Sequence, residues 1–149
     1  MKKEVFKFKV DSNIFESEKS VISGAEMKSI TGLSPDITIY QILDKKAGIK
    51  IIQNDSSVDL SVSGVEKFGV IIQNFSCTLK LNSSDIQWNK QYISYDEVVS
   101  LVYGTNEVLK VSITYSHGPE TNPNGNLLIG EIILVKDFIR ITADGTVKS

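Results

Sequence analysis

The residues that could carry out covalent or acid–base chemistry are few, and their setting argues against an active site. Cys77 is the only cysteine and His117 the only histidine. Cys77 occupies an apolar position of a predicted strand, where a free cysteine usually packs as a small buried side chain. His117 belongs to the loop signal Ser-His-Gly-Pro, and neither a Gly-x-Ser-x-Gly nucleophile motif nor a glycine-rich phosphate loop occurs. The sequence therefore predicts no catalytic residues, and an enzyme is the least favoured class.

The sequence also argues against several kinds of ligand. One cysteine and one histidine cannot form the Cys- or His-rich site that holds zinc, so we expect no metal and no cofactor. The net charge is −2, and the 15 lysines and Arg140 form no basic cluster of the kind that binds nucleic acid. No apolar run approaches the roughly 20 residues that span a bilayer, and charge returns by Lys7, too early for a signal peptide. We therefore expect a cytoplasmic protein that binds neither nucleic acid nor a membrane.

The apolar residues that must position any functional surface are mostly β-branched. The 149 residues include 19 Ile and 14 Val, but only 10 Leu, 3 Ala and 2 Met. Branching at Cβ restricts a side chain in a helix and packs well on a pleated sheet. With 41% hydrophobic and 23% charged residues, the chain can form a folded core. The composition excludes a helical bundle and predicts sheets.

The two halves of the chain align at a spacing of 71 residues, and the motif Ile-Ser-x-x-Glu stands before apolar residues in both. Ser23 and Ser94 each precede a glutamate by three positions, which is the capping-box pattern at the start of a helix. Gly32 and Gly104 follow, where a glycine in the left-handed conformation can end a helix. The pattern predicts two short helices at the same place in a duplicated unit.

Strands are predicted at equivalent places around the two helices. Alternating apolar residues at positions 6, 8 and 10 recur at 77, 79 and 81, and Tyr40 and Ile42 map onto Val111 and Ile113. Each half thus has a hairpin, one helix and further strands, an α+β order in which the helix crosses one face of a mixed sheet. The predicted elements are 4–10, 14–22, 23–32, 37–43, 49–52 and 58–72 in the first half, and 75–81, 85–93, 94–103, 108–116 and 127–142 in the second. We place the two domains at residues 1–72 and 73–149.

This order resembles the β-grasp fold of ubiquitin, and two copies resemble a double ubiquitin-like protein. More specifically, the chain is similar to the bacterial multi-ubiquitin-like family from about residue 5 to residue 145. The shared features are the two Ile-Ser-x-x-Glu helix starts, Ser116-His-Gly-Pro followed by Asn124-Gly-Asn-Leu-Leu, and Lys136-Asp-Phe before the closing strand. The resemblance implies two tandem ubiquitin-like β-grasp domains, each a mixed sheet with one short crossing helix. It also implies a protein modifier whose partners are an E1-like activating protein, an E2-like conjugating protein, a JAB-like peptidase and protein targets.

Such a modifier acts through an extended C-terminal tail, in which glycine lets an activating enzyme approach the backbone closely. Ubiquitin ends in two adjacent glycines, whereas this chain has one, Gly145, followed by four residues up to Ser149. Three interpretations stay open: trimming by a peptidase after Gly145, conjugation through Ser149 itself, or a tail that is never attached. We favour a conjugated modifier over a non-conjugated module for interaction or assembly. A sulfur carrier fits less well, because such carriers are generally single units that end in paired glycines.

A surface for contacts is predicted in the first half. Ile37 and Ile39 lie on the strand face opposite Tyr40 and Ile42, so both faces of that strand are apolar. An apolar outer face indicates either a partner surface or an interface between the two units, and we favour the interface. In the second half, the outward positions of the strand at 108–116 are all polar, so the sequence predicts no such patch there.

Overall fold

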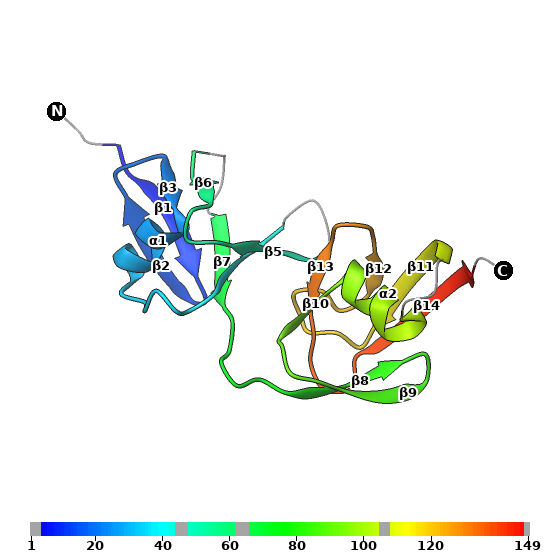
Figure 1. Cartoon of the computed structure of the whole chain (residues 1–149). Coiled ribbons are helices and arrows are strands. Elements are labelled where there is room, and N and C mark those ends of the chain that lie inside the picture. Colours follow the sequence, from blue (N-terminus) through cyan, green and yellow to red (C-terminus); the bar gives the residue numbers. More distant parts are fainter. Residues whose placement is uncertain (1–3, 44–47, 62–65, 105–107, 148–149) are drawn as a thin grey trace. The chain divides into compact units, whose positions relative to one another are not determined.

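The computed structural model describes residues 4–43, 48–61, 66–104 and 108–147 of the chain. The chain divides into two compact units, one made of Met1–Ile42 and Lys50–Gln73, and the other of Leu43–Ile49 and Asn74–Ser149. The helices, shown in Figure 1, are α1 (Gly24–Thr31) and α2 (Tyr95–Tyr103). The strands are β1 (Phe6–Val10), β2 (Asn13–Ser17), β3 (Val21–Ser23), β4 (Ile39–Ile42), β5 (Ile49–Ile52), β6 (Ser57–Asp59), β7 (Glu66–Val70), β8 (Cys77–Leu81), β9 (Ser84–Trp88), β10 (Tyr92–Ser94), β11 (Val108–Ser116), β12 (Gly125–Leu127), β13 (Ile132–Leu134) and β14 (Arg140–Val147).

Each unit begins with the predicted β-hairpin, and its turn is tied to a later strand. β1 pairs antiparallel with β2, and β8 pairs antiparallel with β9. Asp11 (φ 53°) and Asn82 (φ 47°) have positive φ in the two turns, a conformation that Asp and Asn tolerate better than most residues. The Asp11 side chain accepts the backbone N–H of Val70 at 3.4 Å, and the Asn82 side chain accepts that of Ala143 at 2.8 Å. In both units, the residue at this turn position therefore connects the hairpin to the closing strand by a side-chain hydrogen bond.

The closing strand of each unit lies parallel to the first strand of the hairpin. β7 is parallel to β1 and antiparallel to β4. β14 is parallel to β8 and antiparallel to β11. In the second unit these strands form a five-stranded sheet in the order β12-β11-β14-β8-β9. β3 and β6 form a separate two-stranded sheet beside the start of α1.

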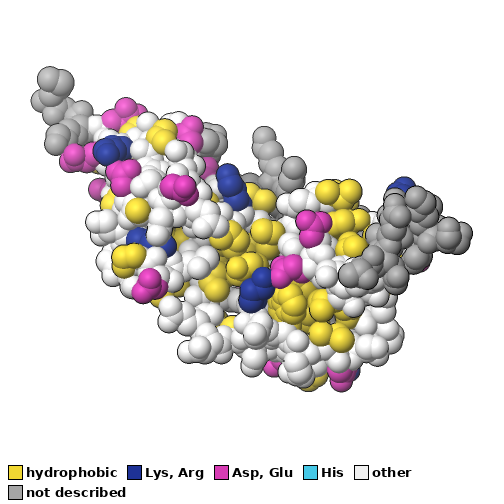
Figure 2. Space-filling model, viewed as in Figure 1, with side chains coloured by type: hydrophobic (Ala, Val, Ile, Leu, Met, Phe, Trp, Pro, Cys, Tyr) yellow, Lys and Arg dark blue, Asp and Glu magenta, His cyan; other side chains and the backbone are white. Residues whose placement is uncertain are grey.

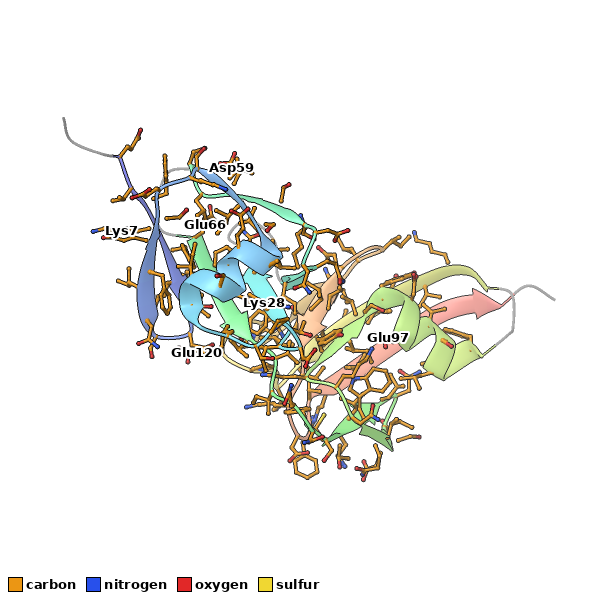
Figure 3. All side chains as sticks on the ribbon, turned by 60° about the vertical axis from the view of Figure 1, so that its left-hand side comes forward. Lys7, Lys28, Asp59, Glu66, Glu97 and Glu120 are labelled. Atoms are coloured by element: carbon orange, nitrogen blue, oxygen red, sulfur yellow. The ribbon has the colours of Figure 1, made fainter. Side chains whose placement is uncertain are left out.

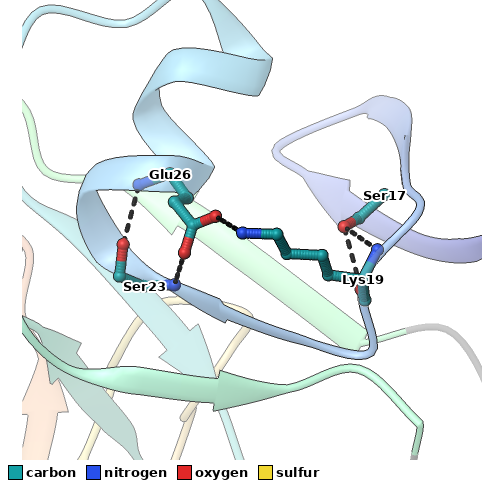
Figure 4. A network of polar contacts seen from close by, with 4 residues as sticks. All are labelled: Ser17, Lys19, Ser23 and Glu26. Atoms are coloured by element: carbon teal, nitrogen blue, oxygen red, sulfur yellow. Dashed lines mark hydrogen bonds and ion pairs between the residues drawn. The ribbon is translucent and has the colours of Figure 1, made fainter.

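Helix α1 begins with the predicted capping box, which Figure 4 shows in detail. Ser23 Oγ accepts the backbone N–H of Glu26 at 3.0 Å, and Glu26 Oε1 accepts the backbone N–H of Ser23 at 3.1 Å. Lys19 adds an ion pair to the other carboxylate oxygen of Glu26 at 2.8 Å. The hydrogen bond from Lys19, together with that from the Ser23 amide, holds the pKa of Glu26 below its ordinary value. The cap therefore keeps a charged carboxylate at the positive end of the helix.

Helix α2 repeats this arrangement 71 residues later. Ser94 and Glu97 form the same reciprocal pair of hydrogen bonds, and Lys90 pairs with Glu97 as Lys19 does with Glu26 (Figure 3 shows Glu97 at the start of α2). α1 ends at Gly32 in the left-handed conformation, as predicted. Gly104 also ends its helix with a positive φ of 61°, but its ψ of −122° lies outside the left-handed helical region. Neither helix in the described parts of the chain is long and apolar enough to cross a membrane.

Each unit has its own apolar core. The core of the first unit is formed by Phe8, Val10, Ile22, Met27, Ile39, Ile52, Val58, Leu60 and Phe68. That of the second is formed by Cys77, Leu79, Leu81, Ile93, Val98, Val111, Ile113, Tyr115, Leu127, Ile133, Val135, Ile139, Ile141 and Ala143. Lys28 of α1 (Figure 3) is a charged residue with little exposure, and its Nζ donates to the Pro35 carbonyl at 2.8 Å and to Asn54 Oδ1 at 2.6 Å. These bonds replace the water that burial removes from the ammonium group.

The predicted fold of two tandem ubiquitin-like β-grasp domains, each a mixed sheet with one short crossing helix, is wrong. The described residues are mostly β-structure in three sheets, and the largest has seven strands in the order β10-β13-β5-β4-β7-β1-β2. The predicted strand at 127–142 is divided into β12, β13 and the start of β14. Alternating apolar residues mark a strand but do not choose its neighbour, because any unpaired strand edge offers the same backbone groups.

The capping boxes lead to a prediction about stability. Ser94→Ala is expected to lower the free energy of unfolding by about 1 kcal/mol, because the Glu97 amide loses its acceptor. Ser23→Ala should have an effect of the same size. Ser100→Ala, at an exposed position of α2, is the control and should leave stability unchanged or slightly raised. Urea unfolding of the three variants checks this, and equal effects of Ser94→Ala and Ser100→Ala would contradict the assigned role.

Candidate functional site

The two side chains with the most reactive chemistry lie apart from any catalytic arrangement. Cys77 is 4% exposed and belongs to the second core. Burial, with a smaller effect of the Asp137 carboxylate, raises the pKa of its thiol to about 11, so very little reactive thiolate forms near neutral pH. His117 is exposed, and its Nδ1 lies 3.1 Å from Ser116 Oγ. The described residues contain no group of three or more His, Cys, Asp or Glu that could hold a metal ion.

The resemblance to ubiquitin predicted that Gly145 lies on an extended tail, and the structure does not place it there. It is part of β14, where it pairs with Val111 of β11. Trimming after Gly145 would therefore cut a paired strand. The other residue predicted for conjugation, Ser149, lies outside the described residues.

The absence of a side chain at Gly145 has a packing explanation. A Cβ at this position would lie 2.7 Å from the Lys110 carbonyl oxygen, 2.9 Å from Tyr103 Oη and 2.9 Å from Val111 Cγ2. Such distances are too short for a carbon atom, so a side chain here would push α2 or β11 away. Gly145 is therefore needed where helix and sheet meet.

Ile37 and Ile39 do not form the predicted surface. Ile39 is fully buried in the first core, and Ile37 is half-buried. The spacing of 71 had matched Ile42 with Ile113, but Ile39 is the structural equivalent of Ile113. Their partners on the closing strands, Val70 and Ala143, donate to the equivalent turn residues of the two hairpins. Because β4 carries isoleucine on both of its faces, the alternation of apolar residues does not show which face is buried. An alignment shifted by an odd number of residues exchanges the two faces of a strand.

The second unit has a groove between α2 and the side of the sheet that carries β12. Its volume is about 680 Å³. The lining residues are Tyr95, Asp96 and Val99 from α2, Lys110, Val111, Ser112, Ile113 and Thr114 from β11, and Asn126, Leu127, Leu128 and Ile129 from β12 and the turn after it. We call this surface the α2–β11 groove.

The rim of the α2–β11 groove is unusually apolar. Leu128 is 59% exposed and Ile129 is 81% exposed, and Figure 2 shows hydrophobic side chains on the surface over this turn and over α2. The turn is closed by the Glu131 amide, which donates to the Leu128 carbonyl at 3.0 Å. Large apolar side chains at a surface turn are costly in water unless another molecule covers them.

The strand β11 forms the floor of the groove, and its two faces differ as the sequence predicted. Lys110, Ser112 and Thr114 are exposed, whereas Val111 and Ile113 are buried in the core. The apolar contact surface therefore lies beside this strand and not on its outer face. Among the lining residues no acid and base are arranged around a nucleophile.

The chain matches no protein-family model, and a search of curated proteins finds no match.

The α2–β11 groove was not predicted from the sequence, although one signal for it was present. Leu128 and Ile129 stand together immediately before Gly130 in a turn, where exposed polar residues are usual. They were assigned to a single strand at 127–142, whose alternation would have buried one of them. Gly130, with φ of 83°, breaks that strand and leaves both side chains at the surface.

The packing at Gly145 predicts the result of adding a side chain. Gly145→Val is expected to lower the free energy of unfolding by about 1–3 kcal/mol, because the new atoms overlap Lys110, Tyr103 and Val111. Asp144→Val, at the exposed neighbouring position, is the control and should change stability little. Thermal unfolding measures both. A Gly145→Val variant as stable as its control would contradict a packing role and would favour a role for Gly145 outside the folded body.

Proposed function

We propose that this chain is a non-catalytic protein-recognition module that binds a partner in the α2–β11 groove. The observation that carries the proposal is the exposed apolar pair Leu128 and Ile129 at the rim of a groove of about 680 Å³. Burying two such side chains against a partner would contribute on the order of 2–4 kcal/mol to binding. A cytoplasmic location stays a prediction from the sequence.

The polar groups of the groove support recognition rather than chemistry. The lining of the groove includes one positive side chain, Lys110, one negative side chain, Asp96, and the amide of Asn126. Polar groups around an apolar centre are the usual composition of a protein interface. Charged groups at such a rim orient a partner and add little affinity by themselves.

The test is to select binders from a display library of short random peptides on the immobilised full-length chain. Peptides that bind through the groove are expected to lose affinity about tenfold or more when Ile129→Lys is introduced, because an exposed apolar contact is replaced by a charge. Ile14→Lys is the matched control, since Ile14 is also an exposed isoleucine but lies on β2 of the first unit, and it should leave affinity unchanged. Isothermal titration of the selected peptides measures both variants. If no selected peptide responds to Ile129→Lys, the groove is not the recognition site.

A second candidate function is a protein modifier that is attached through the residues after β14. The observation that favours it is the position of β14, which ends at Val147, directly before Lys148 and Ser149. Attachment through Ser149 would leave every strand pair of β14 in place, whereas use of Gly145 would not. E1-like, E2-like and JAB-like proteins as partners, and protein targets, belong to this proposal.

The modifier function predicts an ATP-dependent adduct. The full chain, incubated with an E1-like protein and ATP, should gain the mass of an adenylate or form a thioester that intact-mass spectrometry detects. A variant that lacks Lys148 and Ser149 keeps all of β14 and should form neither product. The control is the variant Ile129→Lys, which alters the groove and should react normally. Equal behaviour of the full and the shortened chain would rule out attachment through these residues.

A further inference from the structure

The α2–β11 groove borders a strand edge that is only partly covered. β14 pairs with β11 along its whole length, from Val108 to Ser116. On the other side, β12 pairs only with the segment from Ile113 to Tyr115. No further strand of the described residues lies beside β11. The backbone edge from Lys110 to Ser112 is therefore open towards the groove.

The chain itself cannot continue along this edge. After Leu127, the turn at Leu128–Glu131 leads away from β11, and it is held at both ends. The Glu131 amide donates to the Leu128 carbonyl at 3.0 Å, and Glu131 Oε1 accepts the Leu128 amide at 2.8 Å. Gly130 supplies the positive φ of 83° that the turn needs. The turn thus ends β12 beside an unpaired stretch of its neighbour.

The first unit has the same strand order, with β5 beside β4 as β12 lies beside β11. Ile39 of β4 corresponds to Ile113 of β11. Their partners on the closing strands, Val70 and Ala143, donate their backbone N–H groups to the equivalent turn residues of the two hairpins. β4 has the equally long β5 (Ile49–Ile52) as its hydrogen-bonded neighbour. Ile52 of β5 also belongs to the first core. β11 begins at Val108, well before Ile113, whereas β4 begins at Ile39 itself, so the stretch of β11 with an open edge is an extension that the first unit lacks.

The first residue of each helix also differs between the two units. Gly24 begins α1, and a Cβ there would lie 2.1 Å from the carbonyl oxygen of Gln53, the residue directly after β5. At the same place in α2 stands Tyr95, whose hydroxyl donates to the Val111 carbonyl at 2.9 Å. Tyr95 thus supplies one of the hydrogen bonds that a neighbouring strand would otherwise give to the open edge of β11.

We infer, on the basis of the proposed recognition function, that the partner binds as an extended segment that adds a strand to the Lys110–Ser112 edge of β11. Main-chain hydrogen bonds to an open edge require an extended peptide, and side chains at alternate positions then meet the groove. Val99 and Leu127 line the groove beside this edge, so every second residue of the partner segment is apolar. The exposed Lys110 favours an acidic residue among the others. The partner is therefore an extended, alternating apolar and acidic segment of another protein.

The first experiment determines how a groove-dependent peptide from the library selection binds. Each backbone amide of the peptide is methylated in turn, and the affinity for the full-length chain is measured. Strand addition predicts a loss of affinity at every second residue, because alternate amides point towards β11. Sensitive positions spaced by three and four, or no sensitive position, would overturn strand addition and leave recognition by the groove intact. Absence of any peptide that depends on Ile129 would overturn the recognition function itself.

The second experiment uses Tyr95. Tyr95→Phe removes the hydroxyl that occupies the Val111 carbonyl, so the peptide should bind about fivefold more tightly through one hydrogen bond that no longer has a competitor. Tyr103→Phe, at the other end of α2 and outside the groove lining, is the matched control and should leave affinity unchanged. An affinity of Tyr95→Phe equal to that of the control would show that the peptide does not use this edge, and would overturn the inference.

Discussion

The pairing of β11 with β14 is the interaction on which the second unit and its candidate site depend. The ladder extends from Val108 to Ser116, and it places the buried side of β11 in the core and its exposed side in solvent. It also brings Gly145 against α2, where the lack of a side chain lets the helix and the sheet meet closely. Because β14 satisfies only one edge of β11, the other edge must be satisfied by something else, and β12 is too short to do so.

The two units respond to this constraint in different ways. In the first, β5 lies along β4, and Gly24 makes room for the chain that follows β5. In the second, Tyr95 occupies the helix position that corresponds to Gly24 and bonds to the Val111 carbonyl. A duplicated unit thus keeps its internal hydrogen bonds, such as those of Asp11 and Asn82, while one copy leaves a strand edge and an apolar turn at the surface. Lengthening of a strand in one copy of a repeat is a simple route to a binding surface, because the added stretch has an edge that no strand of the repeat covers.

Features that depend on neighbours in sequence were predicted correctly. The capping boxes at Ser23 and Ser94, the two hairpins and the short strand at Ile49–Ile52 are all present. The exposed positions of β11 also agree with its alternation. The sheets themselves were not predictable in this way. A β-strand forms its hydrogen bonds with segments that are distant in sequence, and neither the seven-stranded order nor the burial of Ile39 can be derived from a period of two residues.

The sequence by itself determined the β-rich character of the chain, its repeat and its helix boundaries, because β-branching, serine caps and terminal glycines act within a few residues. Only the tertiary structure decided that Gly145 lies in a strand, that Cys77 has a raised pKa and that Leu128 and Ile129 stand exposed beside an open edge. Each of these depends on which distant segments approach, and the approach is governed by the shape and pairing of whole strands. A residue's type states what it can do, and its surroundings in the folded chain decide whether it does so.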